Sequence, residues 1–257
     1  MKRLVTSQIV SCLMLRLLRY MCLGKRFNIG KILCFRWIAV LLLLFVITSV
    51  QAQEEPPPAG LWLGYTLRKP VGKKFSWNND LQLRFSNQNA FYDYTLIRSG
   101  LQFELNEHFS TSAGILYGMD NYEAKPLPSW KTEKRLWQEC RYLIGELTSL
   151  QAMFQFRLEE RWFVTETANS GEESIFTWRS RHRIDLRKSF TESWRLNVSD
   201  EVMFQYSQGK STFNQNRISA GISRLLSHRN EFSVHLMLIS WKAPDATVLR
   251  LNFLHQL

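Results

Sequence analysis

The feature that most constrains this chain is an alternation of apolar and polar residues that recurs from Leu61 to the last residue. In the stretch FSWNNDLQLRF (75–85), all five apolar residues occupy odd-numbered positions, and Ser76, Asn78, Asp80, Gln82 and Arg84 occupy the even-numbered ones. A period of two places the two classes on opposite faces of a β-strand, whereas a helix would scatter them around its circumference. The sequence therefore predicts an all-β fold built from two-faced strands.

Turn residues divide this region into eleven segments, which we predict to be strands. They lie near residues 61–68, 74–85, 91–105, 109–119, 132–144, 150–163, 174–187, 193–207, 213–226, 230–242 and 246–257. Most run to about a dozen residues, whereas soluble strands cluster near five or six. Strands that cross a bilayer at a tilt need about 9–11 residues. The lengths favour an antiparallel transmembrane β-barrel of about 10–12 strands, although even counts prevail in single-chain bacterial barrels.

The predicted connections alternate between short and long. Short turns are predicted near residues 106–107, 145–149, 189–193 and 227–230, and long loops at 120–130 and 165–173. Short turns on one side and longer loops on the other are typical of outer-membrane barrels. Tryptophans near segment ends suit the aromatic girdles of such barrels, namely Trp62, Trp77, Trp130, Trp162, Trp194 and Trp241.

Two acidic residues interrupt the apolar faces of their segments. Asp200 lies among Val198, Val202 and other apolar residues, and Glu160 lies beside Trp162. A β-bulge near Ser199, or a position at the depth of the bilayer interface, would accommodate them.

Residues 1–52 differ in composition from the rest of the chain. They hold eight Lys and Arg and no Asp or Glu, so the formal net charge of +11 falls to +3 beyond them. The basic excess therefore belongs to this segment, which argues against a nucleic-acid partner. Its apolar run, Ile38–Val50, is shorter than the roughly 20 residues of a spanning helix, and it precedes Ala52 in the manner of a signal peptide.

We therefore expect a signal peptide over residues 1–52 with cleavage after Ala52, a Pro-rich spacer over 53–60 and a barrel domain over 61–257. An uncleaved N-terminal anchor is the alternative, and Met14 and Met21 are alternative starts. Cysteine usage agrees with export. One cysteine, Cys140, lies beyond the leader, so the mature chain can form no intrachain disulfide. No second apolar stretch of spanning length follows, so a membrane crossing would require a closed barrel.

The end of the chain alternates to its last residue, with Leu249, Leu251, Phe253, His255 and Leu257 on one parity. Barrel-assembly machinery commonly reads a C-terminal strand of this kind, although the usual terminal residue is Phe. The partners expected from the sequence are thus the lipid bilayer and the barrel-assembly machinery. The expected location is the outer membrane, and no small-molecule ligand is identifiable.

Several short motifs resemble a known family of exported β-barrels, filed as domain of unknown function 2490. The motifs are Trp62, Arg84, Glu133–Gln138 (EKRLWQ), Arg157–Arg161 (RLEER), Asn214–Ile218 (NQNRI) and Gly221. The resemblance spans nearly all of residues 62–257. It implies an outer-membrane barrel and no particular reaction, so no catalytic residue is carried over.

The most distinctive polar feature is a ladder of charged residues on the face opposite the apolar one. Its members are Glu133, Arg135, Arg157, Glu159, Arg161, Arg179, Arg181, Arg183, Asp185, Glu201 and Arg217. One interpretation is an arginine-lined lumen that attracts anionic solutes. The other, which we favour, is a set of ion pairs that fills a narrow barrel, because the carboxylates are nearly numerous enough to pair every arginine.

A barrel enzyme that acts on lipid or lipopolysaccharide would need a Ser and a His on one strand face. Ser180 with His182 and Ser233 with His235 have that spacing, but such pairs arise readily by chance. No GxSxG, HExxH or Gly-rich phosphate-binding motif occurs, so no metal or cofactor is expected.

The leading hypothesis is therefore a non-enzymatic barrel, either a narrow pore or a structural or surface protein. A lipase-like or deacylase-like barrel enzyme is the alternative, and a soluble periplasmic β-sandwich that carries lipid is a third possibility. The orientation of the apolar face discriminates among them. A membrane barrel requires six apolar residues to point outward: Phe154, Phe156, Leu158, Phe176, Trp178 and Ile184.

Overall fold

The structure, a computed structural model, describes residues 59–86, 92–124, 127–147, 150–167, 171–240 and 246–257. The expected signal peptide, its cleavage site after Ala52 and the spacer up to residue 58 lie outside the described residues. Within the described ranges, no helix is long and apolar enough to cross a membrane.

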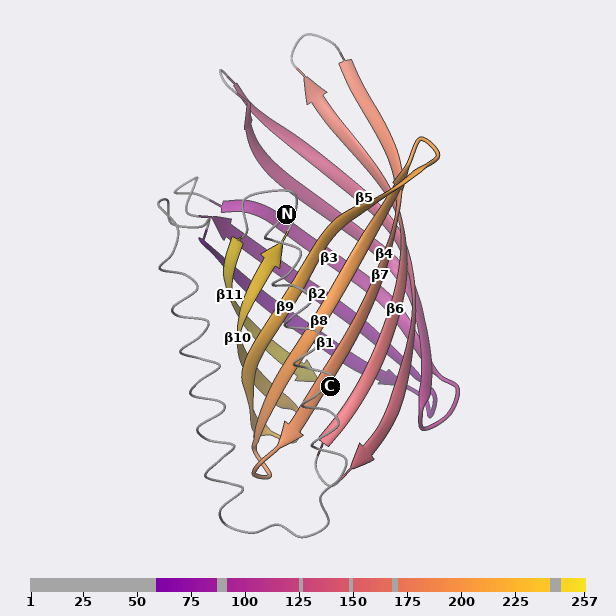
Figure 1. Cartoon of the computed structure of the whole chain (residues 1–257), viewed down its shortest axis with the longest axis vertical. Coiled ribbons are helices and arrows are strands. Elements are labelled where there is room, and N and C mark those ends of the chain that lie inside the picture. The colour runs from indigo at the N-terminus through magenta and orange to yellow at the C-terminus, as the bar shows by residue number, and fades with distance from the viewer. Residues whose placement is uncertain (1–58, 87–91, 125–126, 148–149, 168–170, 241–245) are drawn as a thin grey trace, which may run out of the picture. The chain divides into compact units, whose positions relative to one another are not determined.

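Within the described ranges, eleven strands close into a single barrel, with each strand hydrogen-bonded to its neighbours in the chain (Figure 1). They are β1 (Ala59–Val71), β2 (Phe75–Ser86), β3 (Tyr92–Glu104), β4 (Phe109–Ala124), β5 (Leu127–Leu147), β6 (Leu150–Thr167), β7 (Gly171–Ser189), β8 (Trp194–Ser207), β9 (Lys210–Ser227), β10 (Asn230–Ser240) and β11 (Ala246–Gln256). The predicted all-β barrel and its eleven segments are confirmed.

The odd strand count determines how the barrel closes. Neighbours in the chain pair antiparallel, so the first and last of eleven strands run in the same direction, and β1 pairs with β11 in parallel. In this seam, Trp62 lies opposite Arg250 and Leu67 lies opposite His255. The backbone amide of Leu257 donates to the carbonyl oxygen of Arg68 at 2.9 Å, which continues the seam to the end of the chain.

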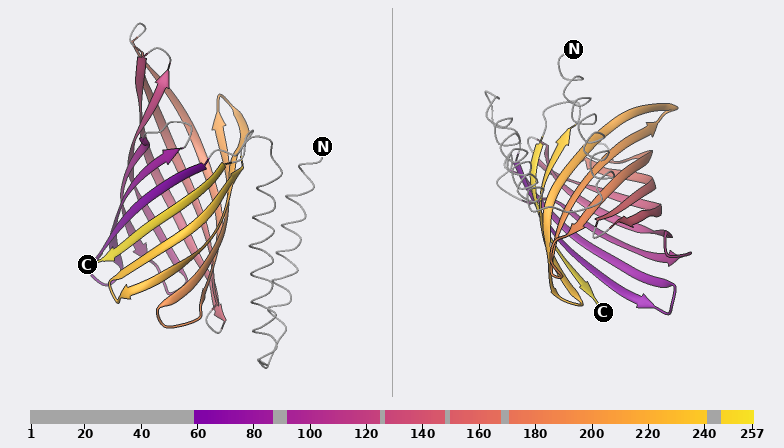
Figure 2. Two further views of the ribbon diagram at one scale, coloured as in Figure 1. Left: turned by 90° about the vertical axis from the view of Figure 1, so that its left-hand side faces the viewer. Right: turned by 60° about the horizontal axis from the view of Figure 1, so that its bottom comes forward.

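The strands extend further than predicted at one end of the barrel. The β4–β5 ladder continues to the pair Ala124–Leu127, and the β6–β7 ladder continues to Thr167–Gly171. The long loops predicted at 120–130 and 165–173 are therefore wrong, because most of these residues belong to two hairpins that project beyond the rest of the barrel (Figures 1 and 2). Backbone pairing persists there although the apolar–polar alternation stops.

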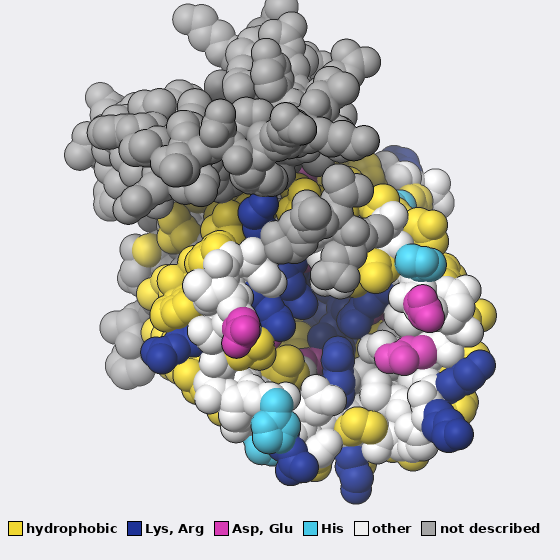
Figure 3. Space-filling model, turned by 90° about the horizontal axis from the view of Figure 1, so that it is seen from below, with side chains coloured by type: hydrophobic (Ala, Val, Ile, Leu, Met, Phe, Trp, Pro, Cys, Tyr) yellow, Lys and Arg dark blue, Asp and Glu magenta, His cyan; other side chains and the backbone are white. Residues whose placement is uncertain are grey.

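The apolar face points outward. Phe154, Phe176, Trp178 and Ile184 are between 36% and 49% exposed, whereas Glu159 on the opposite parity is 1% exposed. Phe156 and Leu158 share the outward parity of β6, and the ring centroids of Phe156 and the outward His182 lie 5.1 Å apart. Seen from below, apolar side chains form much of the outer rim, and Lys and Arg side chains gather around the central hollow (Figure 3).

Asp200 and Glu160 keep the outward parity. Asp200 lies in register between Ile184 and Ile218, and the ladder of β8 runs unbroken through Ser199. The bulge suggested there is wrong, since the register of β8 against β9 shifts only between Met203 and Phe204.

Among the described residues, Trp62 and Trp137 lie inside the barrel and pack against its wall. Trp62 is 8% exposed in the interior, so its assignment to an outer girdle is wrong: it shares the inward parity of Gly60 and Gly64 on β1. Trp137 is 6% exposed and lies over Gly100 and Gly114. A Cβ at Gly114 would come within 2.1 Å of the Ser99 carbonyl oxygen and 2.8 Å of the Trp137 ring. The missing side chains of the two glycines thus let Trp137 lie close against the wall.

We expect Gly114→Ala to destabilise the barrel by about 1–3 kcal/mol, because the added methyl group meets backbone atoms that cannot move independently. Gly118→Ala is the matched control: the three atoms nearest to its added Cβ belong to the Tyr94 side chain and none of them to the backbone. Heat-induced unfolding of the two purified variants, followed by gel mobility, compares them. A Gly114→Ala barrel as heat-resistant as the parent would contradict this packing.

Candidate functional site

The candidate site is the charged interior of the barrel, which β5 to β9 supply with most of its ionic groups. Alternate residues of each strand point inward, so β6 contributes Arg157, Glu159 and Arg161, all of them buried. Strand pairing then places some like charges directly opposite one another. Arg135 faces Arg161 across β5 and β6, and Arg157 faces Arg181 across β6 and β7. Opposed like charges destabilise a sheet unless other groups bridge them.

Glu159 is the centre of the bridging network. Its carboxylate lies 2.5 Å from Arg179, 2.8 Å from Arg181, 3.6 Å from Arg135 and 3.8 Å from Arg157. Arg179 donates from both Nε and Nη2 to the same oxygen. One buried carboxylate thus contacts arginines from three strands, β5, β6 and β7.

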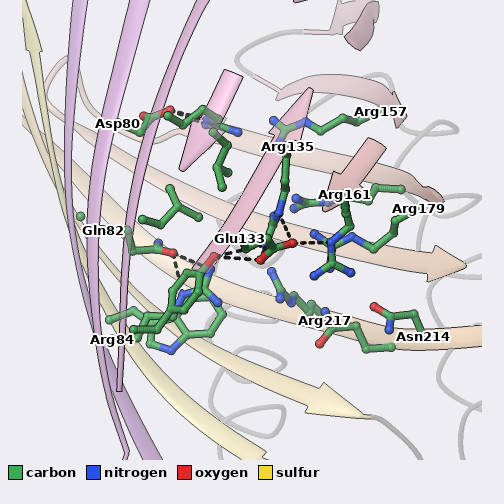
Figure 4. Close-up of a pocket in the computed structure, with 18 of the residues that line it drawn as sticks. Asp80, Gln82, Arg84, Glu133, Arg135, Arg157, Arg161, Arg179, Asn214 and Arg217 are labelled. Atoms are coloured by element: carbon green, nitrogen blue, oxygen red, sulfur yellow. Dashed lines mark hydrogen bonds and ion pairs between the residues drawn. The ribbon is translucent and has the colours of Figure 1, made fainter. Parts of the chain in front are cut away.

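Three further glutamates complete the network. Glu133 accepts from Arg135 and from Arg161, at 2.6 Å for each Nε (Figure 4). Glu139 accepts from Arg157 and lies 2.5 Å from Arg141. Glu201 accepts from Arg181 at 2.8 Å. Each of these carboxylates joins two neighbouring strands by charge-assisted hydrogen bonds, which are stronger than neutral ones.

The eleven residues of the predicted ladder all face the interior, but they do not all pair equally. Arg183 donates to Asp185 on its own strand, at 2.5 Å from Nη2. Arg217 lies 3.9 Å from Glu201, and its buried Nε has no hydrogen-bond acceptor in the described part of the chain. The ladder is therefore dense around Glu159 and sparse near β9.

A cavity of about 680 Å³ remains inside the barrel beside this network. Eleven arginines line it: Arg84, Arg98, Arg135, Arg141, Arg157, Arg161, Arg179, Arg181, Arg183, Arg217 and Arg250. Asp80, Asp120 and Glu133 line it too, and Glu139, Glu159 and Glu201 lie behind its surface in contact with the arginines. Arginines thus outnumber carboxylates here, so the near-balance of charge expected from the ladder does not extend to the cavity.

Some of the cavity arginines lie against aromatic rings. The guanidinium carbon of Arg84 is 3.9 Å from the Trp62 ring centroid and that of Arg217 is 5.1 Å from it. Arg98 and Arg157 lie 5.4 Å and 5.2 Å from the Trp137 ring. Cation–π contacts of this kind hold arginines in place without neutralising them.

The ladder predicted from the sequence does not contain Arg84 or Arg250. Arg84 lies on the polar face of the stretch 75–85, so its alternation pattern already points inward. Arg250 lies on the same face as Val248 and Asn252 of β11 and opposite Trp62. Only the parallel β1–β11 seam brings these two distant parts of the sequence together.

Comparison with known protein families supports the resemblance indicated by the sequence motifs. The family model described as "Protein of unknown function (DUF2490)" matches residues 59–247, which hold β1 to β10 and the start of β11. The chain belongs to the DUF2490 family. An uncharacterised protein of Methylorubrum extorquens is 26% identical to it over 121 residues, which cover 47% of this chain and 51% of that relative. The match thus spans about half the length of this curated relative.

The two Ser–His pairs of this DUF2490 protein lie on opposite faces of the wall. Ser180 and His182 are on the outward parity of β7, where the His182 ring contacts Phe156 and Phe204. Neither residue makes a side-chain hydrogen bond or ion pair within the described ranges.

Ser233 and His235 point into the lumen. The hydroxyl of Ser233 donates to the backbone oxygen of Asn252 at 3.5 Å, and the His235 ring lies close to Gly221. Neither serine is hydrogen-bonded to its histidine, so the structure does not assemble either pair into a nucleophile and base. The described residues also contain no group of three or more His, Cys, Asp or Glu placed to hold a metal ion.

We expect Glu159→Gln to lower the free energy of unfolding by about 3–5 kcal/mol, because removing one partner of a buried ion pair leaves uncompensated charges. Glu231→Gln is the control. Its pair with Arg195, at 3.1 Å, is more exposed, and its loss should cost about 1 kcal/mol or less. Denaturant unfolding of the folded barrels measures both. Equal stability of the two variants would contradict a central role for Glu159.

Proposed function

We propose that this protein is an exported β-barrel of the outer membrane, non-enzymatic, with a lumen braced by arginine–carboxylate ion pairs. The observation that carries the proposal is the inverted polarity of the barrel. Large apolar side chains are exposed on the outside, and charged side chains are buried inside. A lipid bilayer is the environment that suits such an exterior.

The dimensions of the strands support a membrane location. They range from 11 residues in β10 and β11 to 21 residues in β5, and a tilted strand needs about 9–11 residues to cross a bilayer. Closure leaves no sheet edge, so the backbone hydrogen-bonding groups of the strands are paired within the wall, as lipid requires. A soluble lipid carrier would need the opposite polarity, with an apolar interior.

The proposed role of the ladder is structural before it is selective. Arg181 bridges Glu159 and Glu201, and Arg157 bridges Glu139 and Glu159, so the pairs form a continuous connection from β5 to β8. Such a connection resists separation of neighbouring strands. The sequence-based alternative, a lipase-like barrel enzyme, gains no support from the contacts of His182 or His235.

We expect the protein expressed with its full leader to fractionate with the outer membrane and to begin near Gln53. The physical reason is the exposed apolar exterior, which is unfavourable in water. Sucrose-gradient fractionation tests the location, and mass spectrometry of the purified chain tests the processing. Release into the soluble fraction by osmotic shock would contradict the location, and a chain that retains residues 1–52 would contradict the cleavage.

A further inference from the structure

We propose that Arg84, Arg217 and Arg250 form a binding site for the phosphate or carboxylate group of a small organic anion, within the lumen cavity. The inference goes beyond the bracing role proposed above, because it concerns the arginines that the ion-pair network leaves without a close carboxylate. The proposed site is formed by residues of the barrel interior, so it does not require the proposed membrane location.

Arg84 is fixed in place by neutral partners. Its Nε and Nη2 donate to Oε1 of Gln82 at 2.9 and 2.7 Å, and its guanidinium carbon lies 3.9 Å from the Trp62 ring centroid and 4.9 Å from that of Tyr94 (Figure 4). No carboxylate of the described residues forms an ion pair with it. Arg84 is thus oriented, has no ion-pair partner among the described residues, and has hydrogen-bond donors left for a ligand.

Arg250 and Arg217 each have a buried guanidinium nitrogen without a hydrogen-bond partner. The Nε of Arg250 is buried and lacks an acceptor, and no ion pair joins this residue to a carboxylate of the described chain. The Nε of Arg217 is buried without an acceptor too, and its ion pair with Glu201, at 3.9 Å, is the longest of those around the network. A buried charge without a close counter-ion is costly, so an anion bound here would stabilise both.

Trp62 brings the three arginines together. Strand register places it directly between Arg84 on β2 and Arg250 on β11, and Arg217 lies 5.1 Å from its ring centroid. All three side chains line the same cavity. Several guanidinium groups around one space are suited to phosphate or carboxylate, whose oxygens accept paired hydrogen bonds from the planar fork of arginine.

The cavity also indicates the kind of molecule that carries the anionic group. Its volume of about 680 Å³ lies within the roughly 300–1,000 Å³ of small-molecule pockets, more than a lone inorganic ion needs. Asn214 and Gln215 line it, and their buried side-chain oxygens have no donor among the described residues. Hydroxyl groups could satisfy these oxygens, so the chemistry fits a hydroxylated organic phosphate or carboxylate.

The test is calorimetric titration of the purified, folded full chain in detergent with two probes, inorganic phosphate and citrate. We expect binding of at least one probe, and a loss of affinity of about tenfold or more in Arg84→Gln and in Arg250→Gln. Arg195→Gln is the matched control, because Arg195 is paired with Glu231 and does not line this cavity. Tighter binding of phosphate assigns a phosphorylated ligand, and tighter binding of citrate assigns a carboxylated one.

Failure of both probes to bind a barrel shown to be folded by its gel mobility overturns the proposal. An equal loss of affinity in Arg195→Gln overturns it too, since the probes would then respond to net charge alone. Either result leaves the membrane location intact, because fractionation tests that location independently. Arg84→Lys keeps the charge but not the planar fork, and we expect its affinity to fall between those of the parent and Arg84→Gln.

Discussion

The structure depends on the contact between one buried carboxylate, that of Glu159, and the arginines around it. A barrel of eleven strands has a wide interior, and in this chain many of the inward residues of β5 to β7, together with Glu201 of β8, are charged. Bringing Arg135, Arg157, Arg179 and Arg181 into one space is possible only with negative charge among them. Glu159 supplies it at the centre, and Glu133, Glu139 and Glu201 supply it around the periphery.

This arrangement explains why the wall can be inverted relative to a soluble protein. The interior is held together by charge-assisted hydrogen bonds, so the apolar residues are not needed for an internal core and face outward instead. Small clusters such as Tyr94, Leu96, Leu116 and Trp137 are exceptions on the inner surface. Within this cluster, the Tyr94 ring lies against Arg84, which has no close carboxylate, and the Tyr94 hydroxyl donates to Glu133. Tyr94 thereby connects the bracing network to the proposed anion site.

Much of this fold was predictable because the period of two is a local property. Parity alone identified the outward residues of β6 and β7 and the inward ladder, and turn residues delimited eleven strands. The closing seam was not predictable in the same way, since the pairing of Trp62 with Arg250 joins opposite ends of the chain. The projecting hairpins were missed because backbone pairing continues past Asp120 and Thr165, where side-chain alternation no longer signals it. The surplus of arginine in the cavity depends on cross-strand register, which no single segment encodes.

The proposed membrane location requires an exterior that faces lipid, and Cys140 provides a direct probe of that exterior. This exposed thiol lies mid-strand on β5, on the parity opposite Glu139, between Thr111 and Phe156 on the neighbouring strands. A bimane label on Cys140, in a chain with Cys12, Cys22 and Cys34 replaced by Ser, can be reconstituted into vesicles that contain brominated lipid. A lipid-facing exterior predicts strong quenching by the brominated chains and little quenching by aqueous iodide. Quenching by iodide and none by the brominated lipid would contradict it.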